Sequence, residues 1–262
     1  MTELAERAER ELSEIVSRYG GAEGEVVRAF FTQPHTTEEY LDVCLRQAGR
    51  EIHTAYQMHR GLEMLEGLED TATREDLYEQ MEHITDEVRH YSLLAELAEE
   101  LAGKKLGREL LKYWVFAVYD PTVPRNRLYN EHLPEANAAL DFGKELMDHF
   151  GWEYGKSLTR LAEGGGGGAF VEATHHDADA FQRRFSQVMG RIYQDEVGHG
   201  PGMVREYAMS RVKSGEQLEE DKQWLAQFMS HHLRLRNEIY RYPLSPARLA
   251  EIDSLQPQPA TA

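Results

Sequence analysis

Asp86-Glu87-Val88-Arg89-His90 and Asp195-Glu196-Val197-Gly198-His199 repeat one pattern, Asp-Glu-x-x-His, with Glu87 and Glu196 at corresponding positions. Residues three apart on an α-helix lie on the same face, so each string places a carboxylate beside an imidazole. Carboxylates with one imidazole per metal suit iron or manganese, whereas zinc more often recruits cysteine, and Cys44 is the single cysteine. The repeat predicts two helices that together hold a dinuclear metal site.

Composition indicates one globular, helical domain spanning residues 1–262. The chain is 41% hydrophobic and 29% charged, which is enough apolar material for a sizeable core. A single cysteine excludes a disulfide framework and an in-chain iron-sulfur or rubredoxin-like site. Apolar runs are too short to span a membrane, and the acidic start Met1–Glu6 is unlike a signal peptide, so we expect a cytoplasmic protein. The net charge of −17 disfavours nucleic acid and anionic lipid as partners.

Hydrophobic periodicity predicts helices along the chain and no convincing strand pair. A charged first helix is expected to stop at Gly20-Gly21, and a capped helix to start at Thr36 or Thr37. Proline residues 121, 124 and 134 indicate a long crossover between two helical pairs. The expected helical segments are 2–18, 36 or 37 to about 68, 74 to about 101, 106–119, 135–162, about 177–210 and about 216–240.

Two long helices, a crossover and two further helices follow the connectivity of a ferritin-like four-helix bundle with additional helices at both ends. The bundle core is expected at about 36–210. A C-terminal helix is expected at about 216–242, and residues 253–262 are expected to form a mobile tail.

A dinuclear site in such a bundle needs one further carboxylate on each partner helix. Glu51 lies about as far before the turn near residue 70 as Glu87 lies after it, so it is the predicted partner of Glu87. If the second turn lies near residue 175, Glu163 is the corresponding partner of Glu196. Glu153 and Glu172 remain alternatives, and Glu153 requires the glycine run itself to form the turn.

Five consecutive glycines, Gly164–Gly168, allow two interpretations. A helical pentaglycine is unfavourable by roughly 0.8 to 1 kcal/mol per residue relative to alanine, which favours a linker. Alternatively, the glycines belong to a distorted helix and leave room for oxygen and substrate beside the metals.

The string Asp86–His90 resembles the Asp-Glu-x-Arg-His repeat of oxygenases among the ferritin-like non-haem diiron carboxylate proteins. Asp195–His199 departs from that repeat, because Gly198 occupies the arginine position. The resemblance covers about residues 36–210. It implies two iron ions, one bound by Glu51, Glu87 and His90 and the other by Glu163, Glu196 and His199, with Asp86 and Asp195 holding the histidine tautomers.

His83 precedes Glu87 by four residues on the same helical stripe, so it is a candidate extra ligand. An added histidine of this kind is similar to that of the diiron N-oxygenases, although theirs sits on the other half of the repeat. His175-His176 and His231-His232 are interpreted as a turn and a solvated pair. The other candidate pocket residues are Tyr56, Tyr91, Tyr193, Arg125 and Arg127.

The resemblance implies an enzyme that activates O2 and hydroxylates or N-oxygenates a small organic substrate. The chain has no flavin motif and too few cysteines for an iron-sulfur cluster, so electrons are expected from a ferredoxin, flavodoxin or reductase. Manganese is an alternative metal at either position, and a homodimer is expected. The alternative functions are a ferritin-like iron oxidiser or peroxidase and a diiron tRNA hydroxylase.

Overall fold

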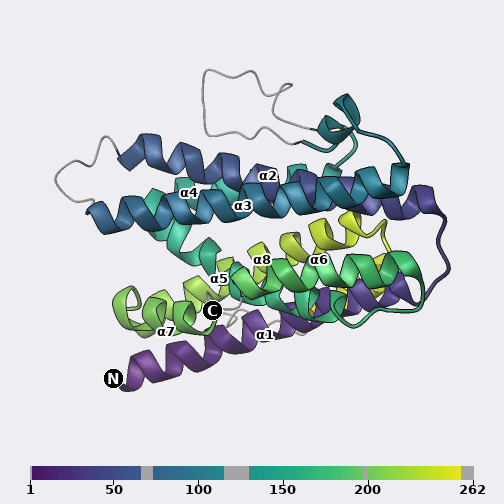
Figure 1. Cartoon of the computed structure of the whole chain (residues 1–262). Coiled ribbons are helices and arrows are strands. Elements are labelled where there is room, and N and C mark those ends of the chain that lie inside the picture. The colour runs from purple at the N-terminus through teal and green to yellow at the C-terminus, as the bar shows by residue number, and fades with distance from the viewer. Residues whose placement is uncertain (1, 66–72, 115–129, 197–199, 255–262) are drawn as a thin grey trace. The chain divides into compact units, whose positions relative to one another are not determined.

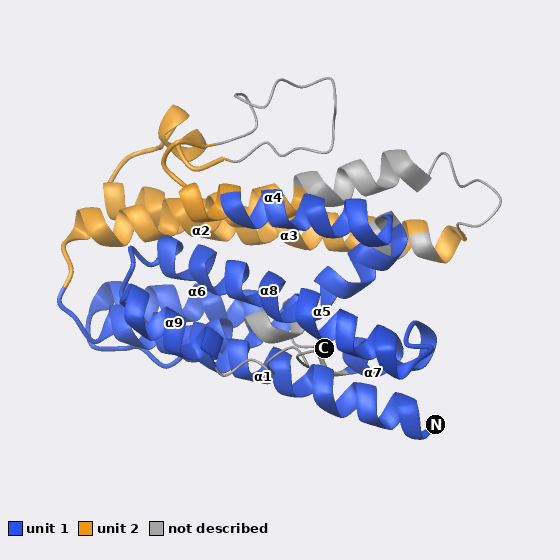
Figure 2. Ribbon diagram, turned by 180° about the vertical axis from the view of Figure 1, so that it is seen from behind, with its two compact units in different colours: residues 1–34, 138–262 blue, residues 35–137 orange. Residues whose placement is uncertain are grey.

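The computed structural model describes residues 2–65, 73–114, 130–196 and 200–254. Every regular element in these ranges is a helix, which confirms the predicted all-α class (Figure 1). No helix among the described residues is long and apolar enough to cross a membrane. The chain divides into two compact units, His35–Asn137 and Met1–Pro34 with Ala138–Ala262 (Figure 2).

The unit His35–Asn137 is built on a hairpin of α2 (Thr37–Leu65) and α3 (Arg74–Ala102), which pack side by side (Figure 2). Thr36 starts α2 as predicted: its Oγ1 accepts from Glu39 N at 3.2 Å, and Glu39 Oε2 accepts from Thr36 N at 2.9 Å. This reciprocal capping box satisfies two amide groups that the helix leaves unpaired. The expected start of this helix is confirmed.

The described part of the segment predicted as a helix over 106–119 contains no α-helix. Within its described part, residues 106–114, the regular element is a short 3₁₀ turn, η2 (Arg108–Leu111), and residues 115–129 lie outside the described part. The chain after η2 is held against α2 by Tyr113, which is 2% exposed, and a Cβ at Gly49 would lie only 2.5 Å from the Tyr113 carbonyl oxygen. Gly49 therefore lets the chain after η2 lie directly on the α2 backbone.

The other unit is organised around α1 (Glu3–Phe31), which packs on α5 (Trp152–Ala173), α7 (Gly200–Ser210) and α8 (Gly215–Ile239). Its α5 also packs on α6, α7 and α8. The elements that complete this unit are most of α4 (Pro134–Phe150), α6 (Ala180–Glu196) and α9 (Pro246–Ser254).

The prediction that the first helix stops at Gly20-Gly21 is wrong, because α1 continues through both glycines to Phe31. A Cβ built at Gly168 of α5 would lie 1.9 Å from the Gly20 carbonyl oxygen, and one at Gly24 would lie 3.1 Å from the Gly168 carbonyl oxygen. The linker interpretation of Gly164–Gly168 is also wrong, since the whole run is inside α5. These glycines let two helix backbones touch, and the packing outweighs their low helix propensity.

One further boundary differs from the sequence predictions. The helix expected over 135–162 is interrupted at Gly151, whose φ of 80° ends α4 before α5 starts. The described parts of the helix expected over about 177–210 are α6 and α7, and residues 197–199 between them lie outside the described part.

The C-terminal prediction missed α9, which Ser245 caps by accepting from Arg248 N at 3.2 Å. Residue 253 was expected in a mobile tail, but Asp253 accepts a hydrogen bond from the Tyr19 hydroxyl at 3.0 Å and pairs with Arg234. Residues 255–262 of the predicted tail lie outside the described part.

The glycine contact between α1 and α5 gives a stability prediction. Gly168→Ala should lower the free energy of unfolding by at least about 1–3 kcal/mol, because the added methyl group meets backbone atoms that cannot move independently. Gly167→Ala is the matched control, since its Cβ would have no atom within 4 Å. It should stabilise the helix by about 0.5–1 kcal/mol. Denaturant unfolding measures both; equal stability of Gly168→Ala and Gly167→Ala would contradict the contact.

Candidate metal centre

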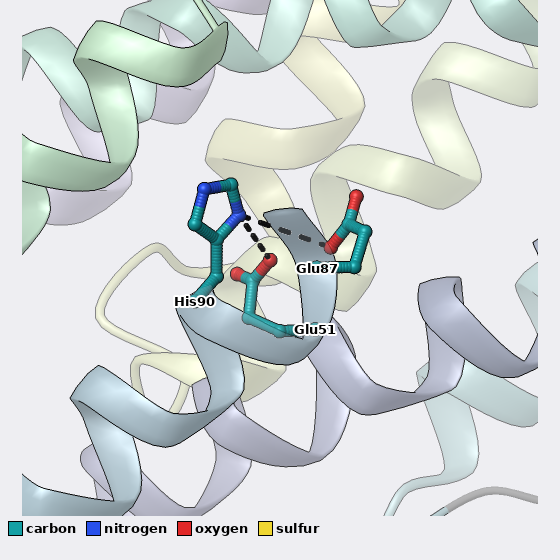
Figure 3. Close-up of side chains that lie close together, drawn as sticks. All are labelled: Glu51, Glu87 and His90. Carbon is teal, nitrogen blue, oxygen red and sulfur yellow. Dashed lines mark ion pairs between the residues drawn. The ribbon is translucent and has the colours of Figure 1, made fainter. Parts of the chain in front are cut away.

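Three predicted ligands meet inside the α2–α3 hairpin. The carboxylates of Glu51 and Glu87 point toward the imidazole of His90 (Figure 3). His90 Nδ1 lies 3.8 Å from Glu51 Oε2 and 4.0 Å from Glu87 Oε2, and one ligand atom of each residue lies within 4.8 Å of the others. All three residues are buried, with His90 fully enclosed.

The two distances from His90 are compatible with a single metal ion. Two donor atoms that each bind an ion at about 2.1 Å lie at most about 4.2 Å apart, and both contacts of His90 Nδ1 are within that limit. With both carboxylates ionised and the imidazole neutral, as in a metal site, the group would carry a charge of −2, which a divalent cation would balance. Within the side chains that the structure describes, this is the group of histidine and carboxylate residues that could hold a metal.

Helix geometry explains why these residues meet. Glu87 and His90 are one turn apart on α3, so both face the same neighbour, and α2 presents Glu51 to them. Ala48 and Ala55, which share a face with Glu51, are 0% and 4% exposed. Their small side chains let the helices approach closely, so a carboxylate on α2 can reach the imidazole on α3.

Gln47, one turn before Glu51, is a neighbour that sequence analysis missed. It is fully buried, and its Nε2 donates a hydrogen bond to Glu51 Oε1. That bond occupies one carboxylate oxygen and leaves Oε2 as the oxygen that faces His90. Gln47 therefore positions Glu51, and the only available signal in the sequence was its i,i+4 spacing.

The local charges favour the ionised form of Glu51. Burial alone would raise the pKa of this carboxyl, but hydrogen bonding and attraction from His90, with hydrogen bonding from Glu87, hold the pKa below its usual value of 4.5. An ionised carboxylate is the form that binds a metal. By contrast, burial raises the pKa of the Cys44 thiol, which opposes the thiolate form that a metal needs.

The second predicted ligand set belongs to the other unit. The structure places Glu163 in α5, but its side chain and the whole of His199 lie outside the described part. Glu196 is the last residue of α6, and both it and Asp195 are half-buried. The assignment of this set to a second metal stays a prediction.

The alternatives to Glu163 lose support. A turn near residue 175 is confirmed, because α5 ends at Ala173 and α6 begins at Ala180. Glu153 required the glycine run to form the turn, and that run is helical. The Glu172 carboxylate is already paired with Arg28, whose Nε donates a hydrogen bond to it at 3.1 Å.

Other candidates have different surroundings. His83 is half-buried and is not a member of the Glu51, Glu87 and His90 group. Asp86 accepts a hydrogen bond from Arg89 Nη2 at 2.8 Å. Its predicted contact with His90 stays a prediction. Tyr91 packs edge-on against Trp114, and Tyr193 is half-buried. Outside the described part lie Arg125, Arg127 and the side chain of Tyr56.

The expectation that His231-His232 is a solvated pair is wrong. His232 Nδ1 lies 2.7 Å from Oε1 of the fully buried Glu23, and Arg236 Nε donates to Oε2 at 3.2 Å. His231 stacks on Phe142 with ring centroids 4.8 Å apart. Glu23 has two cationic or hydrogen-bonding partners, so its charge is compensated by the protein itself.

A second buried carboxyl in this unit lies among tyrosines. Asp221 is fully buried on α8, and the Tyr154 hydroxyl of α5 donates to it at 2.8 Å. Tyr207 of α7 lies close enough to Asp221 to influence its pKa. Burial raises the pKa of Asp221 to about 6, more than Tyr154 and Tyr207 lower it. Nothing in the sequence pattern connects these three residues.

No family model, curated protein or solved structure matches the chain. Function is therefore inferred from this chain's own residues.

The position of Gln47 gives a metal-binding prediction. Gln47→Leu should weaken Co²⁺ or Fe²⁺ binding about 10- to 100-fold, because Glu51 loses the hydrogen bond that orients it. Isothermal titration calorimetry measures the affinity, and circular dichroism checks the fold. Gln182→Leu, which changes a buried glutamine in the other unit, is the control and should leave this affinity unchanged. Equal affinities of the Gln47 variant and the unmodified protein would contradict the role of Gln47.

Asp221 gives a pH prediction. Its folded pKa is above its unfolded pKa of 3.8, so the folded state binds more protons and stability rises as pH falls from about 6 toward 4. As the pH rises from 4 to 7.5, the unmodified protein should lose up to about 3 kcal/mol of its free energy of unfolding through Asp221. Asp221→Asn should not show this loss, because the amide does not titrate. Urea unfolding at several pH values measures this. The exposed Asp177→Asn is the control, and identical pH profiles for Asp221→Asn and the unmodified protein would refute the shift.

Proposed function

We propose that this protein is a non-haem diiron oxygenase that hydroxylates or N-oxygenates a small organic substrate. The observation that carries the proposal is the buried group of Glu51, Glu87 and His90, whose ligand atoms converge at metal-binding distances. Oxygen ligands with one imidazole suit iron, and manganese is the alternative ion.

The second iron is proposed at Glu163, Glu196 and His199, because Asp195–His199 repeats the pattern of the first ligand helix. Its support is the contact between α5 and α6 and the turn between them, which matches the hairpin of α2 and α3. The proposed fold is accordingly a ferritin-like bundle of these four helices.

When bound, the iron ions supply the redox chemistry with O2. The protein's own groups hold and protect that chemistry. Glu51 Oε2, Glu87 Oε2 and His90 Nδ1 provide the ligand atoms, while Gln47 keeps Glu51 Oε1 turned away from them. Burial of the group excludes bulk water, which strengthens the electrostatic attraction of the carboxylates for a cation.

The overall reaction needs an electron donor. One O2, two electrons and two protons convert a C–H or N–H bond to C–OH or N–OH and release one water. The chain has a single cysteine, which is buried. We therefore propose that a ferredoxin, flavodoxin or reductase supplies the electrons.

Metal stoichiometry tests the two-iron assignment. The protein loaded anaerobically with Fe²⁺ and then desalted should hold two iron ions per chain, and Glu196→Ala should hold one. Glu153→Ala is the matched control because Glu153 is exposed at the start of α5, so this variant should still hold two. Atomic absorption measures the iron; two tightly bound ions in Glu196→Ala would refute the second ligand set.

Oxygen consumption separates the functional alternatives. An oxygenase should consume O2 in repeated turnovers with a reductant and substrate and should form an oxygenated product detectable by mass spectrometry with ¹⁸O2. A ferritin-like oxidiser would consume O2 only in proportion to added Fe²⁺. A tRNA hydroxylase would label tRNA instead of a small molecule, and either result would overturn the proposed function.

A further inference from the structure

The exposed face of α3 carries a row of uncharged side chains. The row has Tyr78, Met81, Thr85, Val88 and Ser92, at alternating spacings of three and four residues. Tyr78 is 65%, Met81 50% and Val88 43% exposed, and Leu77 beside them is 42% exposed. In a chain with 29% charged residues, four turns of one exposed helix face are free of charge.

The two hydroxyl groups of the row are already satisfied. Thr85 Oγ1 donates to the Met81 carbonyl and Ser92 Oγ to the Val88 carbonyl, each at 2.8 Å. They present mainly carbon atoms to the outside, so the row is effectively apolar. A 3-4 repeat of this kind is the seam with which one helix packs along another.

We propose that α3 pairs antiparallel with α3 of a second copy of this chain. Charges at the two ends of the row favour this partner: Arg74 precedes it and Glu96 follows it, and both are exposed. Antiparallel pairing brings Arg74 beside the second copy's Glu96, whereas parallel pairing would bring like charges together.

The flanking charges select the same alignment. Glu82 and Arg89 lie on one side of the row, a full heptad apart. With the twofold axis near Thr85, each Glu82 faces the other copy's Arg89. The same axis places each Arg74 opposite the other copy's Glu96, because residues 74 and 96 are equally far from Thr85 along the helix. In this alignment Tyr78 of each copy lies opposite Ser92 of the other, because both are seven residues from Thr85, so a large side chain meets a small one.

One existing contact of Arg89 and one of Glu82 are compatible with this pairing. Arg89 donates to Asp86 within the helix, but both side chains are partly exposed, at 41% and 31%, and such surface pairs are worth little. Glu82 accepts from Tyr78, which belongs to the row itself. A contact along one helix is small for a stable dimer, so we expect dissociation in roughly the micromolar range.

Charge reversal tests the proposal by sedimentation velocity. The unmodified chain should shift from monomer to dimer as its concentration rises through the micromolar range. Glu82→Arg and Arg89→Glu should each move that transition at least about tenfold higher, because like charges then meet. The double variant should restore it, since the charges become complementary again. Met81→Glu should abolish it, and Glu131→Arg, which reverses an exposed charge on the same unit, is the control.

Circular dichroism on each variant shows whether the helices remain intact, which is expected because every changed side chain is exposed or half-buried. A chain that stays monomeric, a dimer that Met81→Glu leaves unchanged, or a double variant no better than the single ones would each overturn the proposal. None of these outcomes bears on iron binding, so the dimer surface and the proposed function can fail separately.

Discussion

The burial of two carboxylates beside one imidazole is the constraint that governs the α2–α3 hairpin. Glu51 and Glu87 can lie in an apolar interior only if their charge is compensated, because an isolated buried carboxylate is very unfavourable. His90 compensates one charge at most, and Gln47 contributes a neutral hydrogen bond. We propose that a divalent cation completes this compensation, which would explain why the helices place three ligand atoms so close together.

The buried charge in the other unit is handled differently. Glu23 lies between His232 and Arg236, so a single carboxylate has two compensating partners from the protein. That cluster links α1 to α8 and needs no ion. The proposed metal centre differs from this cluster, because it brings two buried carboxylates to one imidazole. Residue types alone do not distinguish them, because both contain glutamate and histidine.

Local patterns were enough to predict much of the hairpin. The cap at Thr36, the start of α3 and the pairing of Glu51 with Glu87 followed from spacing within and across two helices. The errors have a common cause in tertiary packing. Gly20 looked like a helix end and His232 like a surface residue, because their partners Gly168 and Glu23 are far away in the sequence. Contacts of that kind are not visible in the sequence pattern around either residue.

Anomalous X-ray diffraction at the iron edge, on crystals grown anaerobically with Fe²⁺, tests the central claim most directly. We predict an iron peak bonded by Glu51 Oε2, Glu87 Oε2 and His90 Nδ1, with Glu51 Oε1 still accepting the hydrogen bond from Gln47. Crystals that contain iron elsewhere, or none, while the three side chains keep their positions would contradict the account. In that case protons alone would balance the buried carboxylates.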